Sequence, residues 1–182
     1  PSPYDFALGG KGLDPSLPGG VSGTLLQAGQ CFMVDMGGNF YGYMGDMSRV
    51  FSIGRLPEQA YTAHQTCIEI QEEIAAMAKP GTVCEDMYNK AIEIVTKAGF
   101  ADYFMGVDQK AKFIGHGIGL EINEMPVLAP RMKQELEPGM VFALEPKIVL
   151  PGIGPVGIEN SWAVTTDGLE KLTLCKEEII EL

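Results

Sequence analysis

The chain has 182 residues, of which 46% are hydrophobic and 20% charged, enough for one domain with a sizeable core. Its formal net charge of −11 excludes nucleic acid as an expected partner, because contacts to phosphates need clustered lysine and arginine side chains. No apolar run has the length of a membrane-spanning helix, and no secretory signal opens the sequence.

The first predicted structural feature is a β-hairpin at residues 34–50, VDMGGNFYGYMGDMSRV. Aromatic and β-branched residues favour strands, and the Gly-Gly-Asn run at 37–39 is a turn signal between them. Asp35 and Asp46 then lie on opposite arms of the hairpin. Because buried carboxylates are costly unless they are paired with a cation, a cation site is one interpretation. The other is two turn aspartates that bind nothing.

Two helices are predicted next, at residues 58–78 and 82–98, from apolar residues that recur at helical spacing. Thr82 and Glu85 form a capping-box signature at the start of the second helix. His64 is predicted to be a partly exposed residue of the first helix. Both apolar faces are interpreted as core rather than as a cofactor site.

Strands are predicted for the rest of the chain, at residues 113–122, 140–149, 157–165 and 169–174. Strands near both ends therefore flank two central helices. This order predicts the α+β class, with a curved, mostly antiparallel sheet backed by the helices. Residues 1–30 are rich in proline, glycine and serine and are predicted to contain a long loop after a short strand at 4–8.

Four motifs carry a resemblance to a known family. They are the hairpin with its two aspartates, Gly115-His116-Gly117 followed by Asn123-Glu124-Met125-Pro126, PGMVFALEP at 138–146, and GIEN at 157–160. In order and spacing the chain resembles the pita-bread metallopeptidases, which include methionine aminopeptidase, aminopeptidase P and prolidase. The resemblance implies the pita-bread fold and one metallopeptidase-like catalytic domain over residues 1–182. It also implies helices before the first aspartate strand, so we expect the C-terminal part of a longer protein.

The resemblance carries five metal ligands onto this chain: Asp35, Asp46, His116, Glu145 and Glu159. It implies that Asp35 chelates one ion, that Asp46 bridges and that His116 binds the other ion. Four carboxylates and one imidazole suit a divalent ion, Mn first, with Co, Fe or Zn as alternatives. Because four carboxylates exceed the charge of one such ion, two ions are predicted. Two ions about 3.5–4 Å apart can share a bridging water and lower its pKa.

Two residues are expected to act in catalysis, Glu145 as a general base and Asn123 at a position where the family's peptidases usually carry histidine. An asparagine side chain can form hydrogen bonds but cannot shuttle a proton. The family also carries a histidine upstream of the first aspartate, and residues 1–30 contain none. Gly157 stands where prolyl-type members often have arginine.

Three other residues near the motifs have predicted environments. Arg49 matches the family's Asp-x-Thr-Arg pattern, with Ser48 in place of threonine, and both are expected to support the metal ligands. Lys112, four positions before His116, is expected to be solvated rather than to provide a charge to the site.

The function implied is a dinuclear hydrolase of the Xaa-Pro aminopeptidase or prolidase type, which cleaves an N-terminal residue or a dipeptide with a metal-bridging hydroxide. A family member with non-peptidase chemistry on a small molecule remains an alternative, as does a catalytically weak metal-binding homologue or a binding module. The expected partner is a small peptide or another small molecule, without nucleic acid or membrane, and a homodimer stays open. Four scattered cysteines without a CxxC pair favour a reducing compartment, the cytoplasm.

Overall fold

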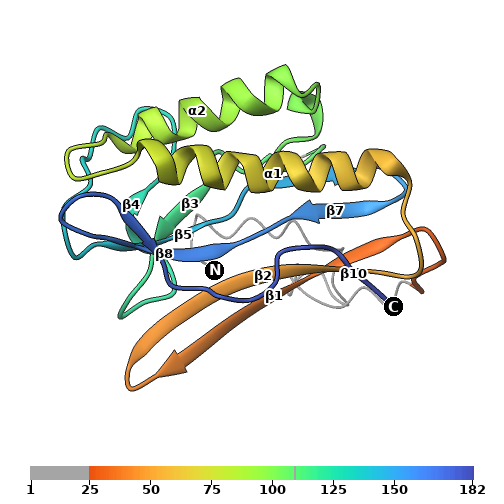
Figure 1. Ribbon diagram of the computed structural model, residues 1–182, viewed down its shortest axis with the longest axis horizontal. Coiled ribbons are helices and arrows are strands. Elements are labelled where there is room, and N and C mark those ends of the chain that lie inside the picture. Colours follow the sequence, from red (N-terminus) through yellow and green to blue (C-terminus); the bar gives the residue numbers. More distant parts are fainter. Residues whose placement is uncertain (1–24, 109) are drawn as a thin grey trace.

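The computed structural model describes residues 25–108 and 110–182. In these residues two helices cover one side of the strands, and the first two strands lie on the side away from the helices (Figure 1). The helices are α1, Glu58–Met77, and α2, Cys84–Lys97, and a short 3-10 helix spans Ala101–Tyr103. The strands are β1 (Cys31–Phe40), β2 (Tyr43–Ser52), β3 (Gly115–Gly117), β4 (Glu124–Val127), β5 (Val141–Leu144), β6 (Lys147–Leu150), β7 (Gly154–Gly157), β8 (Asn160–Val164), β9 (Leu169–Lys171) and β10 (Ile180–Glu181).

The strands pair in three groups, and nearly every pair is antiparallel. One sheet has the order β4-β3-β5-β8-β9, a second is the β6-β7 pair, and a third has the order β1-β2-β10. Only β10 runs parallel to its neighbour among the described strands. The predicted α+β class with a mostly antiparallel sheet backed by helices is therefore confirmed.

The core lies between the two helices and the strands. The residues of α1 that are fully buried recur every three or four positions: Ala60, Ala63, Cys67, Ile70 and Ile74. This face of α1 contacts β6 and β7 as well as α2. Each buried isoleucine contributes roughly 1.5–3 kcal/mol to the free energy of unfolding, so the helical periodicity of the sequence is also its main packing signal. In the described part of the chain, neither helix is both long and apolar enough to cross a membrane.

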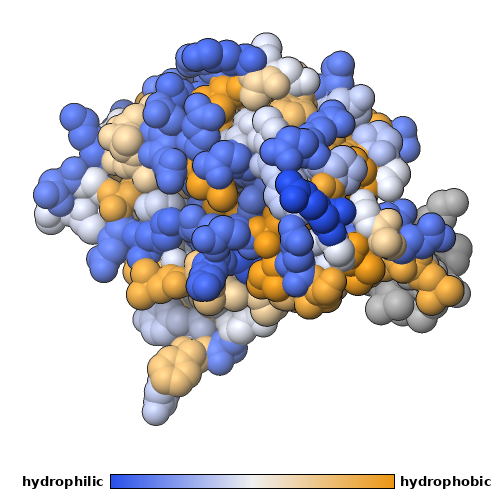
Figure 2. Space-filling model, turned by 45° about the vertical axis from the view of Figure 1, so that its right-hand side comes forward, coloured by the Kyte–Doolittle hydropathy of each residue, from blue (hydrophilic) through white to orange (hydrophobic). Residues whose placement is uncertain are grey.

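The hairpin forms as predicted, but its turn lies elsewhere. Residues 37–39 belong to β1, and the turn is made by Tyr41 and Gly42, with φ of 51° and 89°. A two-residue turn with both φ values positive matches the right-handed twist of the flanking strands. The tip of the hairpin projects from the body of the protein (Figures 1 and 2), and Tyr41 is 89% exposed.

The position of the turn sets the register of the two aspartates. Asp35 is paired with Ser48, and Gly37 is paired with Asp46. Since residues two apart on a strand share a face, Asp35 and Asp46 are diagonal neighbours on one face of the hairpin. The hairpin by itself therefore brings the two carboxylates together.

Two predicted strands are each divided in two. The strand predicted at 140–149 breaks at Glu145 and Pro146, and the one predicted at 157–165 breaks at Ile158 and Glu159. Proline has no N–H to donate to a strand ladder, which explains the first break. At each break the chain passes between the five-stranded sheet and the β6-β7 pair. Both predicted glutamate ligands thus lie where strand pairing changes.

Other boundaries differ by a few residues. The strand predicted at 113–122 is limited to β3, and β4 forms in a segment for which no strand was predicted. The predicted capping box is wrong: α2 begins at Cys84, and the Thr82 hydroxyl instead accepts a hydrogen bond from the Lys79 N–H at 3.0 Å. Glu85 does not bond to the start of the helix, because its carboxylate forms an ion pair with Lys133. The strand predicted at 4–8 and the loop predicted at 9–23 lie outside the described residues.

Candidate metal centre

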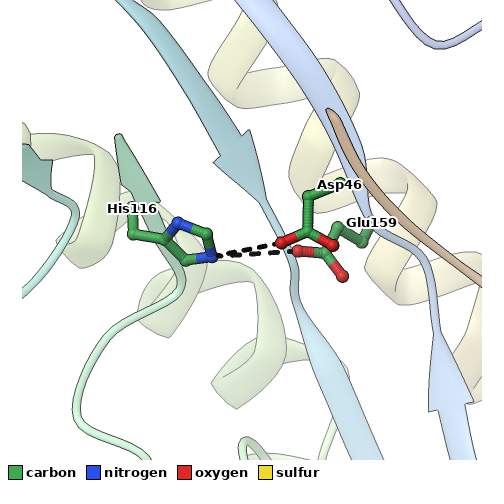
Figure 3. A group of neighbouring side chains, drawn as sticks. All are labelled: Asp46, His116 and Glu159. Atoms are coloured by element: carbon green, nitrogen blue, oxygen red, sulfur yellow. Dashed lines mark ion pairs between the residues drawn. The ribbon is translucent and has the colours of Figure 1, made fainter. Parts of the chain in front are cut away.

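Three predicted ligands meet at a point where β2, β3 and the β7-β8 connection converge (Figure 3). The Nε2 atom of His116 lies 3.8 Å from Oδ2 of Asp46 and 4.0 Å from Oε1 of Glu159. One ligand atom from each of the three residues can be chosen so that all lie within 4.8 Å of one another. Glu145 adds a fourth group, because its Oε1 is 3.4 Å from the same His116 nitrogen.

The flanking glycines place His116 in this position. A Cβ atom at Gly115 would lie 2.3 Å from the Ala143 carbonyl oxygen, and one at Gly117 would lie 2.2 Å from the Met125 carbonyl oxygen. Only glycine therefore allows β3 to pack this closely between β4 and β5. The His116 ring is 7% exposed, and its Nδ1 donates a hydrogen bond to the Gly117 carbonyl at 3.1 Å. That bond leaves the lone pair on Nε2, the nitrogen that faces the carboxylates.

Glu159 is held by the residues that the sequence predicted as supports. Glu159 is 1% exposed, and the Ser48 hydroxyl donates to its Oε2 at 2.6 Å. The Arg49 guanidinium donates from Nη1 to the Glu159 carbonyl at 2.9 Å and from Nη2 to Oδ1 of Asn160 at 2.8 Å. The expected contacts of Ser48 and Arg49 are therefore present, and they fix both the carboxylate and its backbone.

Gln71 is a supporting residue that the sequence analysis missed. It lies on α1, is 1% exposed, and its Nε2 donates to the carbonyls of Leu144 at 2.5 Å and Ile158 at 3.3 Å. Leu144 and Ile158 immediately precede Glu145 and Glu159, so one amide connects the two strand breaks. The available signal was a glutamine beside Ile70 on the mainly apolar face of the helix.

Asp35 has a different environment from the other carboxylates. Its side chain is 56% exposed, whereas those of Asp46 and Glu145 are each 10% exposed. The aspartate was expected to be buried in an apolar strand, but its side chain is exposed, although it shares a face of the hairpin with Asp46. Its contact in the site is with Lys147, whose Nζ is 3.5 Å from Oδ2 of Asp35.

Lys147 is the second residue that the sequence analysis missed. Its side chain is 7% exposed, and its Nζ donates to Oε2 of Glu145 at 2.7 Å. Burial alone would lower the pKa of Lys147, but the charges of Glu145, Glu159 and Asp35 outweigh burial and raise it. The sequence signal was a lysine two residues after a predicted ligand. Lys112, the lysine that was considered instead, is exposed as expected.

The remaining histidine, His64, is buried rather than partly exposed. It is 4% exposed, its Nδ1 accepts a hydrogen bond from the Gly157 N–H at 3.2 Å, and its Nε2 donates to the Glu177 carbonyl at 2.6 Å. Burial lowers the pKa of His64 below its ordinary value. The prediction failed because β7 and the C-terminal segment both pack onto this turn of α1. His64 is a structural residue that connects three segments.

Asn123 does not share the buried position of the ligands. It is exposed, in the loop immediately before β4, whereas His116 lies on the neighbouring strand β3. Its predicted role in catalysis stays a prediction.

Without a metal, burial and mutual repulsion oppose ionisation of two carboxylates of the centre. Burial, and then the charge of Asp35, raises the pKa of Asp46 to about 6. Burial, and then the charge of Glu145, raises the pKa of Glu159 well above its ordinary value. A cation would remove this cost, and the donor set of carboxylate oxygens plus one imidazole nitrogen suits a divalent ion such as Mn²⁺.

Metal-induced stabilisation is expected to increase as the pH rises through about 6. In metal-free protein, the folded state favours the protonated form of Asp46. The stability that this form contributes is fully present below the ordinary pKa of 3.8 and is lost as the pH rises through about 6. A metal binds the deprotonated carboxylate and competes with that proton. Melting curves with Mn²⁺ and with chelator should therefore differ more at pH 7.5 than at pH 5. An equal gain in Tm at both values would show that Asp46 does not bind the ion.

Comparison with known proteins gives a consistent result. A family model described as "Metallopeptidase family M24" matches residues 6–166. The Xaa-Pro dipeptidase of Pyrococcus furiosus is 31% identical over 166 residues, which are 91% of this chain and 46% of that protein. The structure of the Xaa-Pro dipeptidase from Bacillus anthracis matches with a TM-score of 0.80 and 33% identity, over 90% of this chain and 44% of that one.

A solved X-Pro aminopeptidase from Thermotoga maritima matches with a TM-score of 0.78 and 29% identity, over 86% of this chain and 43% of that one. The chain thus spans about half the length of the curated relatives that it matches. The similarity extends over the residues that carry all the predicted ligands.

Proposed function

Because the chain belongs to metallopeptidase family M24, with the pita-bread fold that the sequence resemblance implied, we propose that it forms the catalytic domain of a metal-dependent peptidase. The observation that carries the proposal is the convergence of Asp46, His116 and Glu159, with Glu145 beside them, in a buried cluster. Two of the relatives named above are dipeptidases for Xaa-Pro substrates. We therefore propose short peptides with proline after the first residue as the substrate class.

The residues of the cluster divide the chemical tasks. Asp46, His116, Glu145 and Glu159 would hold the divalent ion, Mn²⁺ by preference, with Co²⁺, Fe²⁺ or Zn²⁺ as alternatives. When bound, such an ion supplies Lewis acidity, which activates water and polarises a carbonyl. Glu145 accepts the proton that the attacking water loses, since its Oε1 faces the centre next to His116 Nε2. The four carboxylates carry enough negative charge to balance the two divalent ions predicted from the sequence, if no other cation lies among them.

Non-peptidase chemistry on a small molecule is the second candidate, and Asn123 is the observation that favours it. Asparagine stands here where the family's peptidases usually carry histidine, so a group that can pass a proton to the leaving amine is missing. General acid–base help of this kind contributes roughly 10²–10⁴-fold to a rate. A peptidase without it would be slow, whereas a reaction with a better leaving group would not need it. We also propose a reducing compartment, the cytoplasm, which the four free cysteines support.

The test is an assay of the full-length protein after loading with Mn²⁺. Xaa-Pro dipeptides and tripeptides are compared with matched peptides in which alanine replaces proline. Cleavage that needs the metal and prefers proline would support the proposal. Metal binding without cleavage of any peptide would favour the small-molecule alternative, and a folded protein that binds no divalent ion at millimolar concentration would refute the metal centre.

The substitution Asn123→His is expected to raise turnover on a Xaa-Pro dipeptide, by up to about 10²-fold if the imidazole reaches the substrate. The turnover should rise because the imidazole of histidine titrates near neutral pH and can transfer a proton. The measurement is the kcat of wild type and variant in the same metal-loaded assay. Asn123→Gln is the matched control, because it changes the side-chain length without adding a titratable group. Equal kcat values for Asn123→His and Asn123→Gln would contradict a role in proton transfer.

A further inference from the structure

Lys147 lies among the carboxylates that would otherwise neutralise a metal ion. Its Nζ is 2.7 Å from Oε2 of Glu145, 3.5 Å from Oδ2 of Asp35 and 3.9 Å from Oε2 of Glu159. The side chain is 7% exposed, so these carboxylates, rather than water, compensate most of its charge. A buried ammonium in contact with three acidic groups is a fixed cation of the centre.

The two glutamates each place one oxygen atom nearer His116 and the other nearer Lys147. Glu145 directs Oε1 towards Nε2 of His116 and Oε2 towards Nζ of Lys147. Glu159 lies farther from both, with Oε1 4.0 Å from the His116 nitrogen and Oε2, which accepts the Ser48 hydrogen bond, 3.9 Å from the Lys147 nitrogen. Carboxylates arranged in this way bridge two neighbouring cation positions. One position adjoins His116 and Asp46, and the other adjoins Asp35 and contains the ammonium group.

We propose that the Lys147 ammonium permanently takes the second cation position, so that the centre binds one divalent ion instead of two. The ion is held by Asp46, His116 and Glu159, with Glu145 shared between it and the lysine. The inference rests on the proposed metal centre but does not depend on the substrate. It replaces the sequence prediction of two ions, which counted the carboxylates without knowing that a lysine lies among them.

The backbone around Lys147 fixes the point from which its side chain enters the centre. Lys147 is the direct partner of Gly157 in the β6-β7 pair. A Cβ at Gly157 would lie 2.9 Å from the Lys147 Cα and 2.3 Å from the Pro146 carbonyl oxygen, so this approach needs glycine. On the other side, the Lys147 carbonyl accepts a hydrogen bond from the Met105 N–H at 2.8 Å. The backbone of Lys147 is therefore fixed on both sides, and its ammonium group is held by the ion pairs with the carboxylates.

The charges of the cluster agree with one ion. Asp35, Asp46, Glu145 and Glu159 provide four negative charges when ionised, and Lys147 provides one positive charge. One divalent ion then leaves a small net negative charge. An additional ion at the second position would have to approach an ammonium group inside a buried site, where repulsion between like charges is poorly screened.

The test counts ions in the full-length protein. Protein freed of metal with chelator is titrated with Mn²⁺, and bound metal is measured by elemental analysis after desalting. We expect one ion per chain for the wild type and two for Lys147→Ala, which removes the charge and opens the position. Lys112→Ala is the matched control, because Lys112 is exposed, and should bind one ion.

Melting temperatures give a readout that is independent of activity. Without metal, Lys147→Ala should melt below the wild type, because three carboxylates lose their cation. With saturating Mn²⁺, its gain in Tm should exceed that of the wild type, since two ions stabilise the folded state.

Three outcomes would count against the inference. Two ions in the wild type would overturn it, and this result requires no variant. One ion in both the wild type and Lys147→Ala would overturn the role of the lysine. No ion in folded wild type would overturn the proposed metal centre itself, and this inference with it.

Discussion

Asp46→Ala is expected to abolish metal-dependent activity and to remove most of the stabilisation that a metal provides. Asp46 lies with His116 and Glu159 in the group whose ligand atoms are within 4.8 Å of one another, so its loss leaves the ion with an incomplete set of ligands. An ion that binds only the folded state stabilises it by about 2.7 kcal/mol when its free concentration is 100 times Kd. Most of this gain should disappear in the variant.

The metal-free protein should respond in the opposite direction. Burial and the charge of Asp35 oppose ionisation of Asp46, so removing the carboxylate relieves repulsion. At pH 7.5 in chelator, Asp46→Ala should therefore melt at the same temperature as the wild type or higher. This reversal distinguishes a metal ligand from a residue that merely supports the fold.

Melting curves with and without Mn²⁺, together with the peptidase assay, check this prediction. Asp102→Ala is a suitable control, because Asp102 is an exposed aspartate of the 3-10 helix. The control should keep both the activity and the metal-induced gain in Tm. An Asp46→Ala protein that gains as much as the wild type on addition of metal would show that Asp46 is not a ligand.

Arg49→Met is expected to lower the free energy of unfolding by about 3–5 kcal/mol, even without metal. Arg49 is 3% exposed, and its guanidinium donates hydrogen bonds to five acceptors. They are the carbonyls of Ser48, Glu159, Cys175 and Lys176 and the side-chain oxygen of Asn160. Methionine fills a similar volume but leaves the three buried acceptors, on Ser48, Glu159 and Asn160, without this donor. It also removes the hydrogen bonds from β2 to the carbonyls of Cys175 and Lys176.

Urea denaturation of metal-free protein measures this effect without interference from ion binding. Arg55→Met is the matched control, because the Arg55 side chain is 79% exposed and its ion pair with Glu58 is 3.9 Å long. An exposed pair of this kind is worth about 0–1 kcal/mol. If Arg49→Met lost no more stability than Arg55→Met, the hydrogen-bond network would not be a major source of stability.

Local sequence patterns determined the helices, the hairpin and the types of ligand residue. The apolar residues of 58–78 recur at helical spacing, and the structure places α1 there with one unbroken buried face. Repeated short-range interactions fix such elements, and they are present in any window of the sequence. The same local signals predict that Asp35 and Asp46 share one hairpin, although they place the turn at 37–39 and the structure has it at Tyr41 and Gly42.

Tertiary packing decided the environments of His64 and Gln71, because their neighbours are distant in the sequence. His64 is buried because β7 and the C-terminal segment cover it, and Gln71 is a support because two strand breaks meet at its amide. Nothing near these residues in the sequence contains that information.

Lys147 shows the difference most directly. The sequence contains 13 lysine and arginine residues, and no local pattern shows which of them faces the carboxylates. The environment of Lys147 is formed by Glu145 on its own segment, Glu159 after the next strand, and Asp35 on a hairpin near the start of the described chain. The sequence alone determined that four carboxylates and a histidine were available for a metal. Only the fold decided that an ammonium group lies among them, because the charge that a buried group experiences comes from neighbours that are distant in the chain.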